Sequence, residues 1–396
     1  MHVTRVERKI VDWLDQHKIG LFILIVSVIA LWTRYVCLDM ESRDWHMFLS
    51  GWFDQIKEGG GLKMIGRQVG DYNVIYQVII ALLTYLPFEP LHLYKAVSIV
   101  FDYVLAVGIG LLAMELKGKR RIYFALGYAL TLFLPTCIFN SAMWGQCDSM
   151  YAAMLAFWFL FTLRKRHIVA FVFLGIAFAL KLQTIFVLPF LIYHYVTRRE
   201  FSILHGLIPL AFAIVPSILC GRHPLETFRI YLGQTANYGS LSLYFPNFWS
   251  IVTGKFNYIG QVAFYVAIAL MGISLLCVMQ KKQLLSTQEG QLYMLIWSVW
   301  TCLVFLPKMH ERYAYFLEML MVVAFLYNFR MFPLAALVET SAVVTYALYL
   351  WGDDSPLPSP MLVAVVLFLP AYAAYTGYIF YRGFKGNAQS GHLLKT

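Results

Sequence analysis

Long apolar runs alternate with short polar segments along almost the whole chain. A helix needs about 20 apolar residues to cross the ~30 Å hydrocarbon core of a bilayer, and most runs approach or reach that length. We therefore expect about 12 transmembrane helices, at residues 19–38, 95–115, 122–138, 148–163, 167–180, 182–197, 203–220, 262–280, 290–306, 312–328, 331–350 and 359–381. The predicted fold class is an all-α polytopic membrane protein, with residues 1–396 forming a single integral membrane domain.

The composition supports a membrane protein and excludes a soluble one. Hydrophobic residues make up 60% of the chain and charged residues only 13%, whereas soluble domains carry about 25% charged residues. The net charge of +10 does not indicate nucleic-acid binding, because the basic residues form short clusters between apolar runs. Membrane lipids with anionic head groups are the partners that such clusters fit.

The basic clusters also predict how the chain is oriented. Cytoplasmic loops of membrane proteins are enriched in Lys and Arg. When the N-terminus is placed in the cytoplasm, the short basic segments all fall on that side, at residues 117–121, 164–166, 198–199, 281–282, 330 and 382–385. Both termini are thus expected in the cytoplasm. Residues 1–18 lead into the first apolar run without a small-residue cleavage site after it, so the first span is expected to be a retained helix.

Two long loops are expected on the outer face, at residues 39–94 and 221–261. In the first, an apolar stripe at helical spacing predicts a juxtamembrane helix lying in the membrane interface and ending at three glycines, residues 59–61. The stripe consists of Trp45, Phe48, Leu49, Trp52 and Ile56. The apolar stretch 73–87 is short for a span. If it were counted as a span, every later basic loop would be placed on the outer face. It is expected to be a second interfacial or re-entrant helix.

The six cysteines show no disulfide or metal-binding pattern. They are scattered, form no C-x-x-C motif, and lie mostly in or beside apolar runs, where Cys behaves as a small hydrophobic residue. We expect no disulfide framework, no metal site and no cofactor.

Most of the unusual polar residues fall near the outer ends of the predicted spans. They are Asp44, Asp71, Asp102, Asn140, Gln146, Asp148, Lys181, Gln183, Lys308, His310, Glu311, Arg312 and Glu318. Ionisable groups at membrane depth are costly and usually face a cavity or a partner, so the grouping predicts a polar outer cavity. Its cations could hold a phosphate, and a carboxylate could take a proton from an attacking hydroxyl. A polyprenyl-phosphate-linked sugar is a substrate that fits both.

Several short motifs, taken in order, resemble the GT-C glycosyltransferases. The motifs are S-R-D-W at 42–45, G-D-Y-N-V at 70–74, N-S-A-M-W-G-Q-C-D-S at 140–149, K-L-Q at 181–183 and K-M-H-E-R-Y at 308–313. The sequence looks closest to the bacterial relatives of the second GPI mannosyltransferase, and more distantly like the dolichyl-phosphate-glucose enzymes of N-glycan assembly. The resemblance covers most of the chain up to about residue 320. It also implies a first outer loop with two juxtamembrane helices.

The resemblance implies roles for individual residues. Asp44 matches the catalytic base, and Lys181, His310 and Arg312 match residues near the donor phosphate, with Lys308 beside them. Asp71 lies where relatives have a D-Y-P-P-like element, but Asn73 and Val74 replace its prolines. Contacts with the sugar or the acceptor are expected from Asp71, Trp144, Gln146, Asp148, Gln183 and Glu311. Such enzymes are inverting and often need no metal.

Each of these residues also has a purely structural interpretation. Asp44 and Asp148 could cap the helices that begin at them, and Lys181 could mark a junction between apolar runs. Asp102 and Glu318 are expected to pair with a Lys or Arg. An outer-loop set of tyrosines could contact an acceptor, namely Tyr231, Tyr238 and Tyr244.

The leading functional hypothesis is a hexosyltransferase that moves one mannose or glucose from a polyprenyl phosphate to an acceptor on the outer face. The acceptor could be a glycan, a lipid or a wall polymer, and a bacterial plasma membrane is the expected location. A lipid-linked glycan flippase or transporter is one alternative, although no internal repeat is visible and transporters place polar residues near the midplane. A polymerase or ligase that transfers a lipid-linked oligosaccharide is the other.

Overall fold

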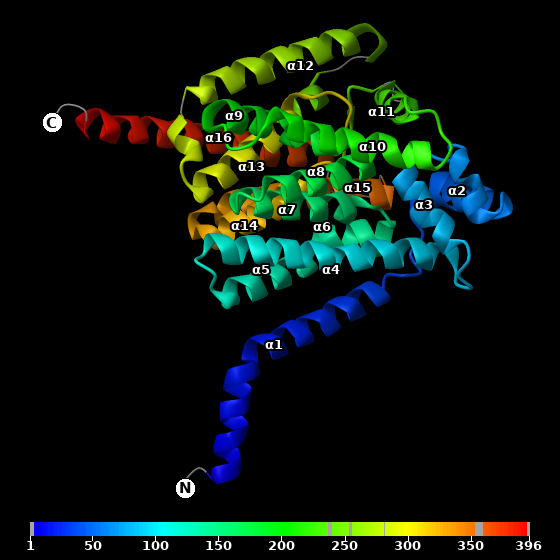
Figure 1. The fold of residues 1–396 in the computed structure, drawn as a ribbon, viewed down its shortest axis with the longest axis horizontal. Coiled ribbons are helices and arrows are strands. Elements are labelled where there is room, and N and C mark those ends of the chain that lie inside the picture. The colour runs from blue at the N-terminus through cyan, green and yellow to red at the C-terminus, as the bar shows by residue number, and fades with distance from the viewer. Residues whose placement is uncertain (1–3, 237–239, 253–255, 281, 353–358, 394–396) are drawn as a thin grey trace.

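The protein is almost entirely helical. The computed structural model describes residues 4–236, 240–252, 256–280, 282–352 and 359–393. Most helices lie side by side along one direction of the bundle, and α2, α3 and α11 gather at one end of it (Figure 1). At the opposite end, the N-terminal part of α1 turns away from the other helices.

The structure contains the following α-helices, in chain order. They are α1 (Arg5–Tyr35), α2 (Ser50–Glu58), α3 (Val74–Leu83), α4 (Pro90–Leu116), α5 (Arg121–Phe133), α6 (Pro135–Ile138), α7 (Asp148–Leu163), α8 (His167–Leu180), α9 (Leu188–Arg198), α10 (Leu207–Leu219), α11 (Glu226–Ala236), α12 (Phe256–Met279), α13 (Gln288–Phe305), α14 (Tyr315–Tyr327), α15 (Phe332–Trp351) and α16 (Pro360–Leu393).

Short helical turns of other types join or extend these helices. Two are π-helical, η1 (Trp45–Leu49) and η3 (Phe139–Trp144). The 3₁₀ turns are η2 (Gly61–Gly66), η4 (Leu182–Val187), η5 (Ile203–Gly206), η6 (Phe248–Ser250), η7 (Lys282–Leu285) and η8 (Phe329–Met331). Two short strands, β1 (Ser242–Leu243) and β2 (Met309–His310), pair in parallel.

The predicted class of an all-α membrane protein agrees with these helices. Each of the 12 predicted spans overlaps a helix. Within the described residues, five helices are long and apolar enough to cross a bilayer, or six if the bent pair 121–133 and 135–144 is one broken span. The other apolar helices are shorter, and five of them have 10 to 17 residues. The count of 12 spans and the orientation of the termini stay predictions.

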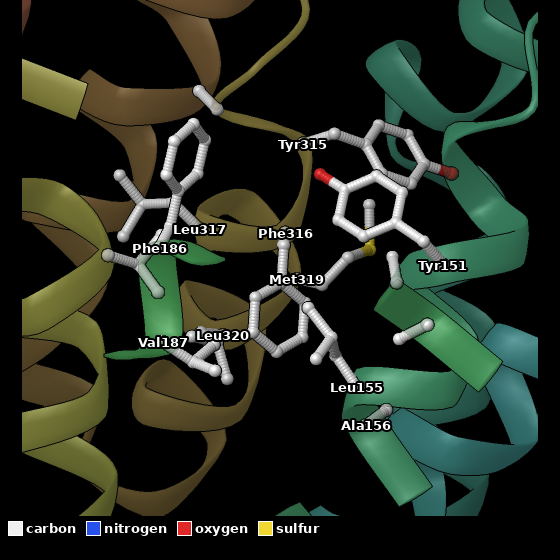
Figure 2. Packing of buried hydrophobic residues seen from close by; sticks show 14 of the residues in the cluster. Tyr151, Leu155, Ala156, Phe186, Val187, Tyr315, Phe316, Leu317, Met319 and Leu320 are labelled. Atoms are coloured by element: carbon white, nitrogen blue, oxygen red, sulfur yellow. The ribbon is translucent and has the colours of Figure 1, made fainter. Parts of the chain in front are cut away.

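The core of the bundle is built around α13 and α14. Almost every residue of both helices is buried, which is typical of a helix surrounded by other helices on all sides. Figure 2 shows side chains of α14, such as Phe316 and Leu320, lying between Val187 of η4 and Leu155 of α7. α14, which begins directly after the loop at residues 306–314, is therefore packed tightly into the core.

The two juxtamembrane helices predicted in the first outer loop are present as η1 with α2, and as α3. Leu49 and Ile56 of the predicted stripe are buried against the rest of the protein, together with Phe53. α2 ends before the glycines, where Gly60 has a φ of +88°, a conformation that glycine adopts without strain. Their location in the membrane interface stays a prediction.

The intramembrane acids have different environments. Asp102 of α4 forms the expected ion pair, because Nε of Arg34 in α1 lies 2.8 Å from its Oδ2 and both side chains are fully buried. For Glu318 of α14, the expectation of a Lys or Arg partner is wrong. Within the described residues, neither of its buried carboxyl oxygens has a hydrogen-bond partner. Instead, Glu318 lies close enough to Glu339, an acid of α15, for the two carboxyl groups to interact electrostatically. Among the described residues, packing places a second acid near Glu318 and no cation in an ion pair with it.

Candidate active site

A cavity of about 360 Å³ opens among η1, α2, η4, the 306–314 loop and the end of α15. Many predicted site residues line it together, although they are far apart in the sequence. They are Asp44, Asp71, Gln146, Lys181, Gln183, His310, Glu311 and Arg312. The predicted polar cavity therefore has a physical counterpart, while its location on the outer face and the chemical role of each residue stay predictions.

Asp44 is held by three hydrogen-bond donors. Trp144 Nε1 and Gln146 Nε2 donate to its Oδ2 over 2.9 and 2.5 Å, and the hydroxyl of Tyr349 donates to its Oδ1. The carboxylate does not cap the helix that follows it. Ser42 caps the helix instead, because its hydroxyl accepts a hydrogen bond from the backbone N–H of Trp45 over 3.2 Å. The helix-cap interpretation of Asp44 is therefore wrong.

The backbone is irregular both at Asp44 and at two of its donors, Trp144 and Gln146, and this irregularity brings the side chains together. Asp44 directly precedes η1, and η3 ends at Trp144. π-Helical turns are rare and frequent at functional sites. After η3, Gly145 turns the chain with a φ of +78°, which lets Gln146 reach the same carboxylate as Trp144. The Ser42 hydroxyl donates to the carbonyl of Trp144 over 3.0 Å and ties the two segments together.

Lys181 lies where the apolar run of α8 breaks. α8 ends at Leu180, Lys181 is extended, and η4 begins at the next residue. The break turns the ammonium group toward Asp148, with which it forms a buried ion pair. Asp148 is the first residue of α7 and is fully buried, yet its side chain also accepts from Asn140 over 2.9 Å. The carboxylate of Asp148 thus serves the cations of the site and does not cap α7.

Arg312 joins the same cluster from the loop between α13 and α14. Its Nη1 lies 2.8 Å from Glu311 Oε1, and its Nε lies 3.4 Å from Asp148 Oδ2. Burial opposes the charge of Arg312, but Glu311, Tyr72, Asp148 and Asp44 together raise its pKa well above the usual range. Asp148 is therefore shared by a lysine and an arginine that line the cavity.

Glu311 and His310 complete this loop. Burial alone would raise the pKa of Glu311, but His310 and the charge of Arg312 hold that pKa below its usual value. The loop is fixed by β2, where His310 pairs with Leu243 of β1 and forms a bridge with Tyr244. The loop at residues 306–314 and the segment at residues 242–244 thus meet at the cavity.

The remaining predicted residues lie elsewhere around the site. Asp71 is exposed and belongs to the cavity wall. Trp144 and Asp148 are fully buried behind the wall, in contact with Asp44 and with the cations respectively. Lys308 is not among the described residues that line the cavity, and its backbone N–H donates to Leu241 over 2.7 Å.

Several wall residues were not singled out from the sequence. The most informative is Tyr349, whose ring also stacks on Trp144 with centroids 4.5 Å apart. An aromatic residue near the end of an apolar run is normally interpreted as an interface anchor, so no local signal marked it. Arg43, Tyr72 and Trp52 line the cavity as well.

The outer-loop tyrosines have different positions. Tyr244 lines the cavity, whereas the hydroxyl of Tyr231 is buried and donates to the carbonyl of Phe178. Tyr238 lies outside the described residues.

Chemically, the cavity offers one positioned carboxylate and two cations whose N–H groups are only partly used by other protein groups. Lys181 has three N–H donors and Arg312 five, and their ion pairs use only part of them. The buried Oε1 of Gln183 has no hydrogen-bond partner among the described residues, and the buried Nε of Arg312 has only the ion pair with Asp148. Such groups could bind an anionic, hydroxyl-rich ligand. Three or more His, Cys, Asp or Glu side chains with the arrangement of a metal site do not occur in the described part of the chain; metal independence stays a prediction.

An all-helical membrane chain with a carboxylate and cations around one cavity fits the GT-C type of membrane glycosyltransferase, and the comparison of families supports that class. The chain belongs to Glycosyltransferase family 87, whose sequence model matches residues 72–307, more than half of its length. The matched region contains Lys181 and Gln183 and leaves Asp44 and residues 310–312 outside. No curated protein matches the chain closely enough to name a relative. The closer likeness to relatives of the second GPI mannosyltransferase stays a prediction.

Proposed function

We propose that the protein is an inverting glycosyltransferase that moves a single hexose from a polyprenyl phosphate to an acceptor outside the cytoplasm. Mannose or glucose is the expected sugar, as the resemblance to GPI mannosyltransferase relatives and dolichyl-phosphate-glucose enzymes implies. A bacterial plasma membrane, with the cavity facing outward, is the proposed location. The observation that carries the proposal is that Asp44, Lys181 and Arg312 line one cavity.

In the proposed reaction, Asp44 takes the proton of the acceptor hydroxyl as that oxygen attacks the anomeric carbon. The bond from this carbon to the phosphate oxygen breaks, and the phosphate leaves with the electron pair. Lys181 and Arg312 stabilise the negative charge of the departing phosphate, as preorganised cations do in other enzymes, and His310 contributes a hydrogen-bonding side chain beside them. A single displacement of this kind inverts the anomeric configuration.

The test is sugar transfer by the purified protein in lipid nanodiscs. Polyprenyl-phosphate mannose and polyprenyl-phosphate glucose are offered separately, with membrane-lipid extract as the source of acceptor. We expect transfer or slow donor hydrolysis from one of them, and a loss of about 10²–10⁴-fold in rate for Asp44→Asn, the usual contribution of a general base.

The control is Asp54→Asn, a carboxylate of α2 that is exposed and does not line the cavity. This variant should keep wild-type transfer, and both variants should keep the wild-type melting temperature. Near wild-type turnover in Asp44→Asn would exclude Asp44 as the base. A stable protein that binds neither donor with acceptor present would favour a flippase, and a product carrying many sugars would favour a polymerase or ligase.

A further inference from the structure

The first turns of α1 form an amphipathic helix that nothing in the described protein covers. All side chains from residue 5 to residue 18 are exposed. Four of the five apolar ones recur at i, i+4, i+7 and i+8, so these four share one face. The four are Val6, Ile10, Trp13 and Leu14, each at least 45% exposed, and the fifth, Val11, lies beyond the edge of this face. The opposite face carries Arg5, Arg8, Asp12 and Asp15, and Lys9 and Gln16 lie at its border with the apolar face.

Local interactions hold this segment in a helical conformation without support from the bundle. Thr4 and Glu7 form a capping box, in which the Thr4 hydroxyl accepts from the Glu7 N–H and the Glu7 carboxylate accepts from the Thr4 N–H. On the apolar face, the rings of Trp13 and His17 stack with centroids 4.6 Å apart. The exposed apolar face is therefore presented by a formed helix.

The position of the segment indicates what covers that face. α1 continues without interruption into a stretch long and apolar enough to cross a bilayer. Figure 1 shows its N-terminal part turning across the long direction of the bundle, at the end opposite to α2 and α3. There, Lys18 and Ile23 line a crevice with Arg121 of α5 and Met114 of α4. The turn between these two helices carries the basic cluster at residues 117–121.

We propose that residues 5–18 lie flat in the bilayer interface, in the leaflet that faces away from the candidate active site. The apolar face would enter the outer part of the acyl chains, and the charged face would remain among the head groups. A helix with a tryptophan and aliphatic residues on one face and Lys and Arg on the other is typical of this location. The basic cluster beside it fits a surface of anionic phospholipid. The proposal does not depend on the proposed transferase function.

Spin labels on the full-length protein in nanodiscs of phosphatidylcholine and phosphatidylglycerol test the proposal. In a background where Cys37, Cys220 and Cys277 are replaced by alanine, labels are placed at Ile10→Cys and Val6→Cys. Matched labels at Arg8→Cys and Asp12→Cys report on the opposite face. Collision with oxygen, which concentrates in the bilayer, is compared with collision with a water-soluble nickel chelate.

We expect the ratio of oxygen to nickel collisions to be about fivefold or more higher at the two apolar positions than at the two polar ones. Equal exposure of all four positions to the nickel chelate would mean that the helix projects into water, and would overturn the proposal. Dipolar broadening of the label at position 10 would mean that a second copy of the chain covers this face, and would overturn it as well.

Discussion

The phenol of Tyr349 donates a hydrogen bond to Oδ1 of Asp44, although 305 positions separate the two residues. The other carboxylate oxygen, Oδ2, already accepts from Trp144 and Gln146. A carboxylate oxygen has about two acceptor sites, so Oδ2 is saturated and Oδ1 keeps one. In the proposed mechanism, the acceptor proton therefore passes to Oδ1, the oxygen whose direction Tyr349 fixes.

Replacing Tyr349 with phenylalanine removes this hydrogen bond and keeps most of the ring that stacks on Trp144. We expect kcat to fall about tenfold, which corresponds to the ~1.4 kcal/mol of one lost positioning hydrogen bond. The KM for the lipid-linked donor should stay unchanged, because Tyr349 is no part of the cation cluster. Steady-state kinetics with the active donor measures both constants.

Tyr94→Phe is the matched control, since Tyr94 is a buried tyrosine that does not line the cavity and whose hydroxyl has no hydrogen-bond partner among the described residues. It should keep a kcat close to that of the wild type. A Tyr349→Phe variant that raises KM and leaves kcat unchanged would contradict the positioning role.

Asp148 should be essential for stability because its carboxylate compensates the buried charges of Lys181 and Arg312. In Asp148→Asn, the buried ammonium of Lys181 loses its carboxylate, and Arg312 loses one of two. Breaking a buried ion pair by removing one partner costs about 3–5 kcal/mol. The thermal unfolding midpoint should therefore fall strongly in Asp148→Asn and recover in part in the double variant Asp148→Asn with Lys181→Met. Additive losses in the double variant would show that the two side chains are not coupled.

The two intramembrane acids should respond in opposite ways to the loss of charge. Asp102→Asn leaves the buried guanidinium of Arg34 without its carboxylate, so we expect a loss of about 3–5 kcal/mol in the free energy of unfolding. Glu318→Gln removes an acid that has no hydrogen-bond partner among the described residues, so stability should stay within about 1 kcal/mol or rise. Unfolding midpoints of the purified variants compare the two. A large loss in Glu318→Gln would indicate a partner for this carboxylate.

Acidification should weaken the loop that carries Arg312. The folded-state pKa of Glu311 lies below its ordinary value of 4.5, so the unfolded chain binds this proton more readily than the folded protein does. The stability that Glu311 contributes is thus present above pH 4.5 and is lost as the pH falls below it. Melting temperatures recorded from pH 6 to pH 3 should decline more steeply below pH 4.5 for the wild type than for Glu311→Gln. Parallel curves would mean that this carboxylate contributes nothing to the acid sensitivity.

The helical elements follow from the sequence because their signals are local. Each predicted span contains enough consecutive apolar residues to form a helix, and each overlaps one. The amphipathic stripe that starts at Trp45 and the apolar stretch 73–87 are likewise helical, and the glycine conformation at Gly60 ends α2 as expected. The interruption of the apolar run at Lys181 also marks a true break between two helices.

Part of the site could be predicted for a similar reason. Polar residues at the ends of apolar runs must find a cavity or a partner. This constraint predicts from the sequence that Asp44, Lys181 and Arg312 lie near one cavity. The sequence did not distinguish wall residues from supporting ones. Asp148 lies behind the cations, and Lys308 is not part of the described cavity wall.

By itself, the sequence determined that the chain is an all-helical membrane protein with polar groups near the ends of its helices. Hydrophobic run length and periodicity act within one segment and can be recognised there. Only the tertiary structure decided that Tyr349 reaches Asp44, that Asp148 is shared by two cations, and that Glu318 meets Glu339 and no cation. Such contacts depend on which faces of distant helices pack together. In a bundle where most faces are apolar, the local pattern does not specify that choice.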